Sequence, residues 1–263
     1  MVILNTHLFP ARALFAALLS LLLANTTIAA TENPVEETVE SASAANVILI
    51  IGDGMDDQQI TIARNYLHGA RGKLTLDTLP HRGAVQVLSI EDAVGGAPVY
   101  VADSANTATS LATGAITSRG RIATSAGDDR DLTTLLEQAA AKGLATGIVT
   151  TSSITDATPA SFMAHISLRV CESPVAMENV TIRDIPVGDC SPDLKATTGP
   201  GSISEQIAAS PVTVALGGGL KHFTPAAEAG DETVIEQARR AGFTVITNAS
   251  ELSSVATAER SLG

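Results

Sequence analysis

The chain has 263 residues, of which 45% are hydrophobic and only 3% aromatic, and its formal net charge is −12. This length suffices for one α/β domain with a sizeable core of aliphatic side chains. The acidic balance argues against a nucleic acid as the partner, because a phosphate backbone needs a basic surface, and any phosphorylated substrate must meet a local positive field.

The first 45 residues are typical of a targeting segment followed by a leader. Residues 1–30 carry one formal charge, Arg12, then an apolar run from Ala13 to Ala24 and small residues suited to cleavage. This pattern predicts a secretory signal peptide, and the run is short for a membrane span, so we expect no membrane contact after cleavage. Residues 31–45 are acidic and contain Pro34, which favours a flexible leader.

The next segments predict strands that alternate with helices. Residues 46–51 are continuously apolar and rich in β-branched side chains, which predicts a strand buried on both faces. Residues 58–67 have helical periodicity, and residues 84–90 and 98–102 read as strands. Small residues then run to Gly114, a plausible helix end, so Ser104 is expected where a strand becomes a helix.

The alternation continues through the second half of the chain. Residues 131–143 predict a helix capped by Asp131, and residues 144–151 a strand. Residues 171–200 lack periodicity, after which helices are expected at 202–209 and 232–241 and strands at 212–216 and 243–247. The pattern indicates one α/β domain over residues 46–263, with an open, mainly parallel sheet and helices on both faces.

The chain contains two cysteines, Cys171 and Cys190. They are free to pair in an oxidising compartment, although their spacing alone does not establish the bond.

Acidic residues follow three of the expected strands. Asp53 comes after the first, Asp103 stands beside Ser104 after another, and Asp156 precedes Thr158. Ligands of open α/β sheets bind at the carboxyl ends of strands, and carboxylates gathered there repel one another unless a cation lies between them. Each residue alone reads most simply as a turn former or helix cap, but together they favour an oxygen-rich Mg²⁺ site.

Ser104 and Arg169 are the residues best suited to phosphate chemistry. The N-terminus of a helix stabilises a phosphate group and the alkoxide of a serine. The guanidinium of Arg169 is able to grip two oxygens of a phosphoryl group, although an isolated arginine is more often a surface charge. The sequence has no G-x-S-x-G, P-loop or H-E-x-x-H motif, and His165 is expected to be a packed histidine rather than a base for Ser104.

Several segments resemble the alkaline phosphatases, particularly the bacterial periplasmic branch. The resemblance runs in order from about residue 46 to the end of the chain. It implies a secreted, periplasmic hydrolase of phosphate monoesters, typically a homodimer, that uses two Zn²⁺ and one Mg²⁺. The segments that carry it are residues 46–55, 103–105, 156–160, 164–169 and 216–223.

The resemblance implies a role for each candidate site residue. Ser104 would be the nucleophile that becomes a phosphoserine, with one Zn²⁺ stabilising its alkoxide. Arg169 would bind the phosphate, oriented by Asp103. The metal positions would be Asp53, which bridges a Zn²⁺ and the Mg²⁺, and Asp156 and Thr158, which hold the Mg²⁺.

The sequence departs from the family pattern in two respects. Asp56 stands where the family commonly has Gly, and the family draws its other metal ligands from a C-terminal half whose motifs do not occur before Gly263. Asp77 and His81 imitate a D-x-x-x-H ligand pair, but we interpret them as a decoy. We therefore expect the N-terminal portion of a phosphatase; the alternative is a truncated, inactive chain that retains only the magnesium and phosphate half of the site.

A sulfatase or phosphodiesterase of the wider superfamily is a third possibility. It is disfavoured because sulfatases need a C/S-x-P-x-R pattern, which the sequence lacks.

Overall fold

The computed structural model describes residues 46–263 except 179, 183–184, 229 and 256–258. The signal peptide and leader expected over residues 1–30 and 31–45 lie outside the described residues. The chain divides into two units, Met1–Ile50 and Ile51–Gly263, and the second contains all the helices and strands described below. No helix in the described part of the chain is long and apolar enough to cross a membrane.

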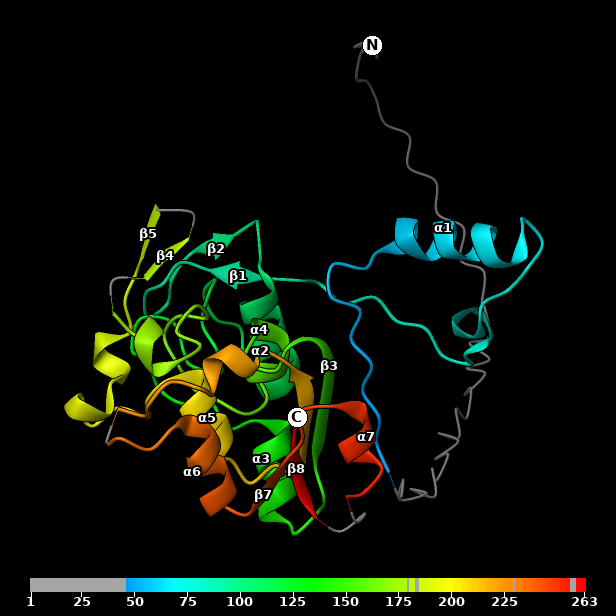
Figure 1. The fold of residues 1–263 in the computed structure, drawn as a ribbon. Coiled ribbons are helices and arrows are strands. Elements are labelled where there is room, and N and C mark those ends of the chain that lie inside the picture. Colours follow the sequence, from blue (N-terminus) through cyan, green and yellow to red (C-terminus); the bar gives the residue numbers. More distant parts are fainter. Residues whose placement is uncertain (1–45, 179, 183–184, 229, 256–258) are drawn as a thin grey trace, which may run out of the picture. The chain divides into compact units, whose positions relative to one another are not determined.

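Four parallel strands form the central sheet in the order β3-β6-β8-β7 (Figure 1). Together with the helices between them, they confirm the open, parallel α/β fold class. Three strands overlap their expected positions, while β8 has only three residues, a length at which no apolar pattern is detectable, and it was not predicted. The strands are β3 (Gly147–Ser153), β6 (Val214–Gly218), β7 (Phe243–Val245) and β8 (Arg260–Leu262).

Helices α3, α5 and α6 begin at the same kind of capping box, in which a Ser or Thr and a Glu three residues later satisfy each other's backbone N–H groups. The cap of α3 is therefore Thr134, whereas the sequence analysis had predicted Asp131. Asp131 instead lies in a β-bridge to Thr124. The α-helices are α1 (Asp57–His68), α2 (Ser104–Thr113), α3 (Leu135–Ala141), α4 (Ala157–Ala160), α5 (Ile203–Ala209), α6 (Val234–Arg240) and α7 (Ala249–Leu252).

Two antiparallel hairpins and several single 3₁₀ turns complete the described structure. β1 pairs with β2, and β4 with β5. The β4–β5 hairpin lies in the segment that had shown no periodicity. The strands are β1 (Ser89–Ile90), β2 (Pro98–Val99), β4 (Val180–Ile182) and β5 (Ile185–Gly188), and the turns are η1 (Thr75–Thr78), η2 (Pro174–Ala176), η3 (Ser191–Asp193), η4 (Lys195–Thr197) and η5 (Leu220–His222).

The hydrophobic core joins the sheet to α2, α4, α5 and α6. Alanines line the contact between α2 and α4, where Ala105, Ala112, Ala157 and Ala160 are fully buried. Such small side chains let the two helix backbones approach closely, which brings the first turns of both helices together. The positions of Asp103 and Asp156, which cap these helices, are thereby fixed.

The strand expected at residues 46–51 is absent, and that prediction was wrong. Residues 46–50 have no regular secondary structure, and Val47 and Ile50 are 85% and 88% exposed. Apolar β-branched residues indicate a buried strand only where neighbouring strands supply hydrogen bonds, and no described strand pairs with this segment.

The strands expected at residues 84–90 and 98–102 are reduced to the two-residue strands β1 and β2. They form an antiparallel hairpin separate from the parallel sheet. The transition from strand to helix before Ser104 is therefore a short connecting segment, and only Asp156 follows a strand of the central sheet.

Candidate functional site

The N-terminus of α2 presents Asp103 and Ser104. Asp103 caps the helix, because its Oδ1 accepts a hydrogen bond from the Asn106 N–H at 3.1 Å while the Asp103 N–H donates to Asn106 Oδ1 at 2.8 Å. Asn106 is fully buried and its Nδ2 donates to the Leu88 carbonyl at 3.0 Å, which anchors the cap. The helix ends at Gly114 in the left-handed conformation, as predicted. The capping interpretation therefore holds for Asp103, but it accounts for only one of its oxygens.

Arg169 connects both α2 residues to α4. Its Nη1 donates to Ser104 Oγ at 2.6 Å and lies 3.3 Å from Asp103 Oδ2, while its Nη2 donates to Asp156 Oδ1 at 2.8 Å. The side chain of Arg169 is 27% exposed and that of Asp156 is 44% exposed, so the group is open to solvent. One guanidinium thus brings together four of the six residues that the sequence had singled out.

The remaining two residues, Asp53 and Thr158, contact each other. Thr158 Oγ1 donates to Asp53 Oδ2 at 2.8 Å. Thr158 lies in the first turn of α4, two residues beyond Asp156, whose carboxylate caps that helix by accepting from the Ala157 N–H at 2.7 Å. All six candidates therefore belong to one connected group around the first turns of α2 and α4.

The donor set of this group suits a hard divalent cation. Asp53 and Asp156 supply carboxylates and Thr158 a hydroxyl, and Mg²⁺ prefers such oxygen ligands. Within the described ranges, no three His, Cys, Asp or Glu side chains are grouped to hold a metal ion. The oxygens present therefore fit part of a magnesium shell, which waters or substrate oxygens would complete, and do not form a zinc site by themselves.

His165 does not contact Ser104. Its Nε2 lies 2.9 Å from Glu137 Oε1 and its Nδ1 lies 3.0 Å from the Ala123 carbonyl. Burial disfavours the imidazolium, but the hydrogen bonds to the carbonyl and to Glu137 outweigh this effect and raise the pKa of His165. The residue is therefore packed in a polar network, as expected, and is not placed to act as a base.

Asp77 is held by arginines, consistent with its interpretation as a decoy. Arg64 donates to its two carboxylate oxygens at 2.7 and 2.6 Å, and Arg82 approaches within 3.5 Å. The hydrogen bonds from Arg64 keep the pKa of Asp77 far below its ordinary value. This bidentate pair joins η1 to α1.

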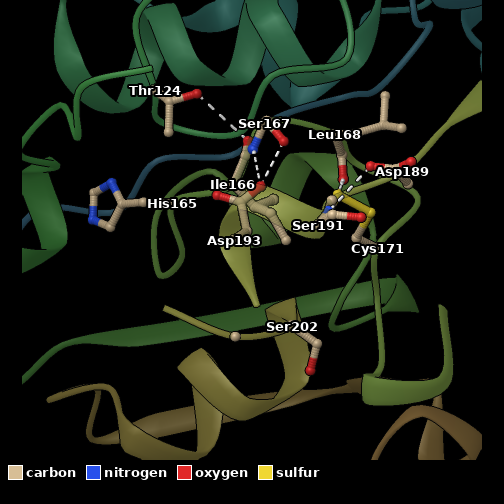
Figure 2. Close-up of a disulfide and its surroundings, with 12 residues drawn as sticks. Thr124, His165, Ile166, Ser167, Leu168, Cys171, Asp189, Ser191, Asp193 and Ser202 are labelled. Atoms are coloured by element: carbon tan, nitrogen blue, oxygen red, sulfur yellow. Dashed lines mark hydrogen bonds between the residues drawn. A yellow bond between two sulfur atoms is a disulfide. The ribbon is translucent and has the colours of Figure 1, made fainter. Parts of the chain in front are cut away.

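Cys171 and Cys190 form a disulfide close to the site (Figure 2). Both residues are fully buried. The Cys171 N–H donates to the Leu168 carbonyl at 3.1 Å, so the bridge anchors the backbone immediately beside Arg169.

Sequence reasoning missed Gly120, whose backbone contacts two site residues. Its N–H donates to Asp103 Oδ1 at 3.2 Å, and its carbonyl accepts from the Arg169 N–H at 2.7 Å. Its φ of +83° favours glycine, and a Cβ there would lie 3.3 Å from Leu168 Cδ1. A lone glycine in a loop carries no signal for such contacts.

A separate cavity of about 380 Å³ lies at the carboxyl ends of β6, β7 and β8. Its lining is mostly apolar and includes Leu216, Phe223 and Ile246, but none of the six site residues. Phosphate chemistry needs fixed positive charge and polar groups, so the Arg169 group is the better candidate.

The chain is similar to known phosphatases in sequence. The sequence model of the alkaline phosphatase family matches residues 44–261. The chain is 44% identical over 214 residues to streptomycin-6-phosphate phosphatase of Streptomyces griseus, and 38% identical over 228 residues to alkaline phosphatase of Escherichia coli strain K12. These matches cover 80% and 85% of this chain but 45% and 46% of the relatives. The chain therefore spans about half the length of the curated relatives it matches.

The chain is also similar to solved structures of alkaline phosphatases. The alkaline phosphatase from the Antarctic bacterium TAB5 matches 82% of this chain with a TM-score of 0.57 and 26% identity, over 52% of that chain. The alkaline phosphatase of Thermus thermophilus matches 81% of this chain with a TM-score of 0.54 and 28% identity, over 38% of that chain.

Proposed function

Because the chain belongs to the alkaline phosphatase family, we propose that it hydrolyses phosphate monoesters with Ser104 as the nucleophile. The observation that carries the proposal is the 2.6 Å contact between Arg169 Nη1 and Ser104 Oγ. A nucleophile and a guanidinium so close together are able to act on one phosphoryl group.

In the proposed reaction, Ser104 Oγ loses its proton and attacks phosphorus, the P–O bond to the substrate's organic group breaks, and the departing oxygen gains a proton to leave as an alcohol. The Ser–O–P bond of the intermediate is then broken by water, which releases inorganic phosphate and restores the hydroxyl. Arg169 donates hydrogen bonds to two non-bridging phosphate oxygens, and its positive charge stabilises the negative charge on them. Asp103 orients Arg169, and its place at the cap leaves Ser104 at the positive end of the α2 dipole.

The proposal includes two Zn²⁺ and one Mg²⁺, as the family resemblance implies. Asp53, Asp156 and Thr158 would hold the Mg²⁺, and Ser104 and Asp53 would face the two Zn²⁺; the described residues contain no group of three His, Cys, Asp or Glu side chains that would complete a zinc site. The metals would supply positive charge that lowers the pKa of hydroxyl groups and of water. A related structure, a mutant of the TAB5 alkaline phosphatase, is described with Mg bound in the M3 site.

The experiment measures turnover of an aryl phosphate with Zn²⁺ and Mg²⁺ present, together with the initial burst of phenol. Ser104→Ala is expected to abolish both. Ser110→Ala is the matched control, because Ser110 lies on the same helix and bonds only to backbone carbonyls. Unchanged turnover in Ser104→Ala would contradict the proposal.

A second candidate is a chain that binds Mg²⁺ and phosphate without turnover. It is favoured by the donor set, which assembles oxygen ligands but, within the described residues, no zinc site. Titration of the wild-type chain with inorganic phosphate, combined with the turnover assay, distinguishes this candidate from the hydrolase. Binding without turnover supports this candidate, and absence of both binding and turnover contradicts both.

We also propose that the protein is exported to the periplasm and acts there, as a homodimer, on small phosphate monoesters. The buried disulfide supports export, because such bonds persist in oxidising compartments. The name of the relative from Streptomyces griseus suggests phosphorylated aminoglycosides as substrates to test first.

A further inference from the structure

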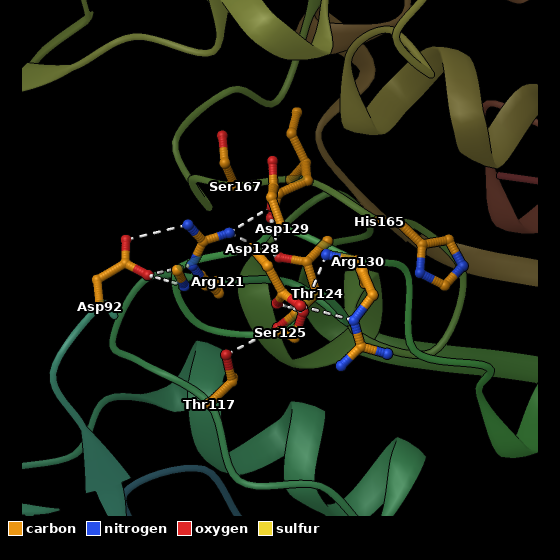
Figure 3. A network of polar contacts seen from close by, with 12 residues as sticks. Asp92, Thr117, Arg121, Thr124, Ser125, Asp128, Asp129, Arg130, His165 and Ser167 are labelled. Atoms are coloured by element: carbon orange, nitrogen blue, oxygen red, sulfur yellow. Dashed lines mark hydrogen bonds and ion pairs between the residues drawn. The ribbon is translucent and has the colours of Figure 1, made fainter. Parts of the chain in front are cut away.

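Arg121 is a buried cation in the loop that follows α2, and none of its side-chain contacts is with a site residue (Figure 3). Its side chain is only 8% exposed. Its Nε and Nη2 donate to the two oxygens of Asp92 at 2.7 and 3.0 Å, and its Nη1 donates to Asp129 and, at 3.1 Å, to Thr124 Oγ1. A buried charge is tolerated only when paired in this way, so the loop is fixed around the guanidinium.

The backbone on either side of Arg121 is bonded to the segment that ends in Arg169. Ile122 and Ile166 exchange two backbone hydrogen bonds, both 3.0 Å long. On the other side, Gly120 accepts from the Arg169 N–H at 2.7 Å and donates to Asp103 at 3.2 Å. A displacement of Arg121 would therefore move the backbone supports of both Asp103 and Arg169.

The carboxylate of Asp193 also supports the segment that ends in Arg169. Asp193 Oδ2 accepts from the Ser167 N–H at 3.2 Å and from Ser167 Oγ at 2.5 Å, two residues before Arg169 (Figure 2). Burial raises the pKa of Asp193 overall, although the hydrogen bonds from Ser167 act to lower it. These two hydrogen bonds hold the backbone just before Arg169, next to the Ile122–Ile166 pairing.

We propose that Arg121 is a positioning residue that sets the geometry of Arg169 and Asp103 toward the phosphoryl group. The inference rests on the proposed function, since it assigns Arg121 to the support of that same site. Arg121 acts through the backbone of its neighbours Gly120 and Ile122, and its own side chain bonds to Asp92, Thr124 and Asp129. Its role is to keep the Arg169 guanidinium where it can grip two phosphate oxygens.

The experiment uses the full chain and measures the dissociation constant of inorganic phosphate by calorimetry, with kcat/KM for an aryl phosphate where turnover is observed. Arg121→Gln is expected to weaken phosphate binding roughly 10- to 100-fold, the usual size of an effect of residues that support a site. Arg121→Lys, which keeps the charge but not the fork of donors, should recover part of this loss. Arg130→Gln is the matched control, because Arg130 is an exposed arginine of the same loop paired with Asp128, and it should change binding less than about twofold.

A double-mutant cycle with Arg169→Ala separates positioning from general destabilisation. If Arg121 acts through Arg169, then Arg121→Gln should lower phosphate affinity by less than about twofold once Arg169 is alanine. Additive effects of the two substitutions, or wild-type affinity in Arg121→Gln, would overturn the inference.

Should Arg121→Gln fail to fold, Asp129→Asn replaces it in the same cycle, because that substitution removes one ion pair and leaves the Asp92 pair intact. A smaller loss of affinity that disappears in the Arg169→Ala background supports the inference, and an additive one overturns it. Failure of the wild-type chain to bind phosphate would instead contradict the proposed function itself, and the inference would fall with it.

Discussion

The hydroxyl of Thr158 donates a 2.8 Å hydrogen bond to the carboxylate of Asp53, a residue 105 positions earlier in the chain. Asp53 lies in a turn and is exposed, so this contact is what ties the turn to the first turn of α4. If a cation were bound between these two oxygens in place of the hydrogen bond, Asp53 and Thr158 would be neighbouring ligands.

Magnesium affinity should therefore depend on Asp53. We expect Asp53→Asn to weaken Mg²⁺ binding about tenfold or more, because the site loses one of its two carboxylate charges. Calorimetric titration with magnesium chloride measures the effect. Asp57→Asn, which changes an exposed carboxylate in the first turn of α1, is the control. Equal affinities in the two variants would remove Asp53 from the metal site.

The planar fork of Arg169 should matter as much as its charge. Arg169→Lys keeps the positive charge but cannot contact Ser104 and Asp156 from two nitrogens at once. We expect a roughly 10- to 100-fold loss in kcat/KM for an aryl phosphate, or in phosphate affinity where turnover is absent. Arg130→Lys should leave both quantities unchanged. A fully active Arg169→Lys variant would show that bidentate recognition is not used.

The disulfide should contribute about 3 kcal/mol to the free energy of unfolding, given a sequence separation of 19 residues. Replacing Cys171 and Cys190 together by alanine is expected to lower Tm by roughly 6–12 °C. Differential scanning calorimetry checks this. The wild-type chain, once unfolded and refolded with reductant, should approach the Tm of the variant, while the variant itself should not respond to reductant.

The ion pair between His165 and Glu137 should make stability depend on pH. Since the pKa of His165 is raised in the folded state, its contribution is complete below the unfolded value of about 6.5 and is lost as pH rises through the folded pKa. Although burial acts to raise the pKa of Glu137, hydrogen bonds from Thr134 and His165 lower it overall. Its contribution is present above the ordinary value and lost as pH falls through the lowered one.

His165→Gln should thus be more destabilising at about pH 6 than at about pH 8.5, as measured by urea unfolding. His222→Gln should show the opposite trend, because burial lowers the pKa of His222. A profile for either variant that runs opposite to its expected direction would contradict the pKa shift assigned to that histidine.

Much of the fold followed from local chemistry. Helix α2 was predictable because a run of small residues ends at Gly114, with a residue able to cap the helix, Asp103, at its start. Thr134 replaced Asp131 as a cap because the reciprocal bonds of a capping box satisfy two backbone donors, whereas a lone aspartate satisfies fewer. The prediction of a buried strand at residues 46–51 failed because a strand is buried only if other strands pair with it. A local sequence pattern does not reveal whether such partners exist.

The candidate site was predictable in its members but not in its arrangement. Asp53, Ser104 and Asp156 stood out by residue type, yet the expectation that each follows a strand of one sheet holds only for Asp156. The structure brings the group together by packing α2 against α4 and by the reach of Arg169. Gly120 and Arg121 could not be predicted from the sequence. Gly120 acts through its backbone, and Arg121 does not contact the site directly, so neither has a recognisable sequence motif.

Gly120 links Asp103 and Arg169 through the two sides of a single α-carbon. The separation between these two backbone groups depends on a single dihedral angle, ψ of Gly120, because the bond lengths and bond angles between them are nearly constant. A movement of the Gly120 loop would therefore displace the supports of Asp103 and Arg169 together. The spacing of Asp103 and Arg169 thus depends on the backbone of one glycine rather than on the rotamers of a side chain.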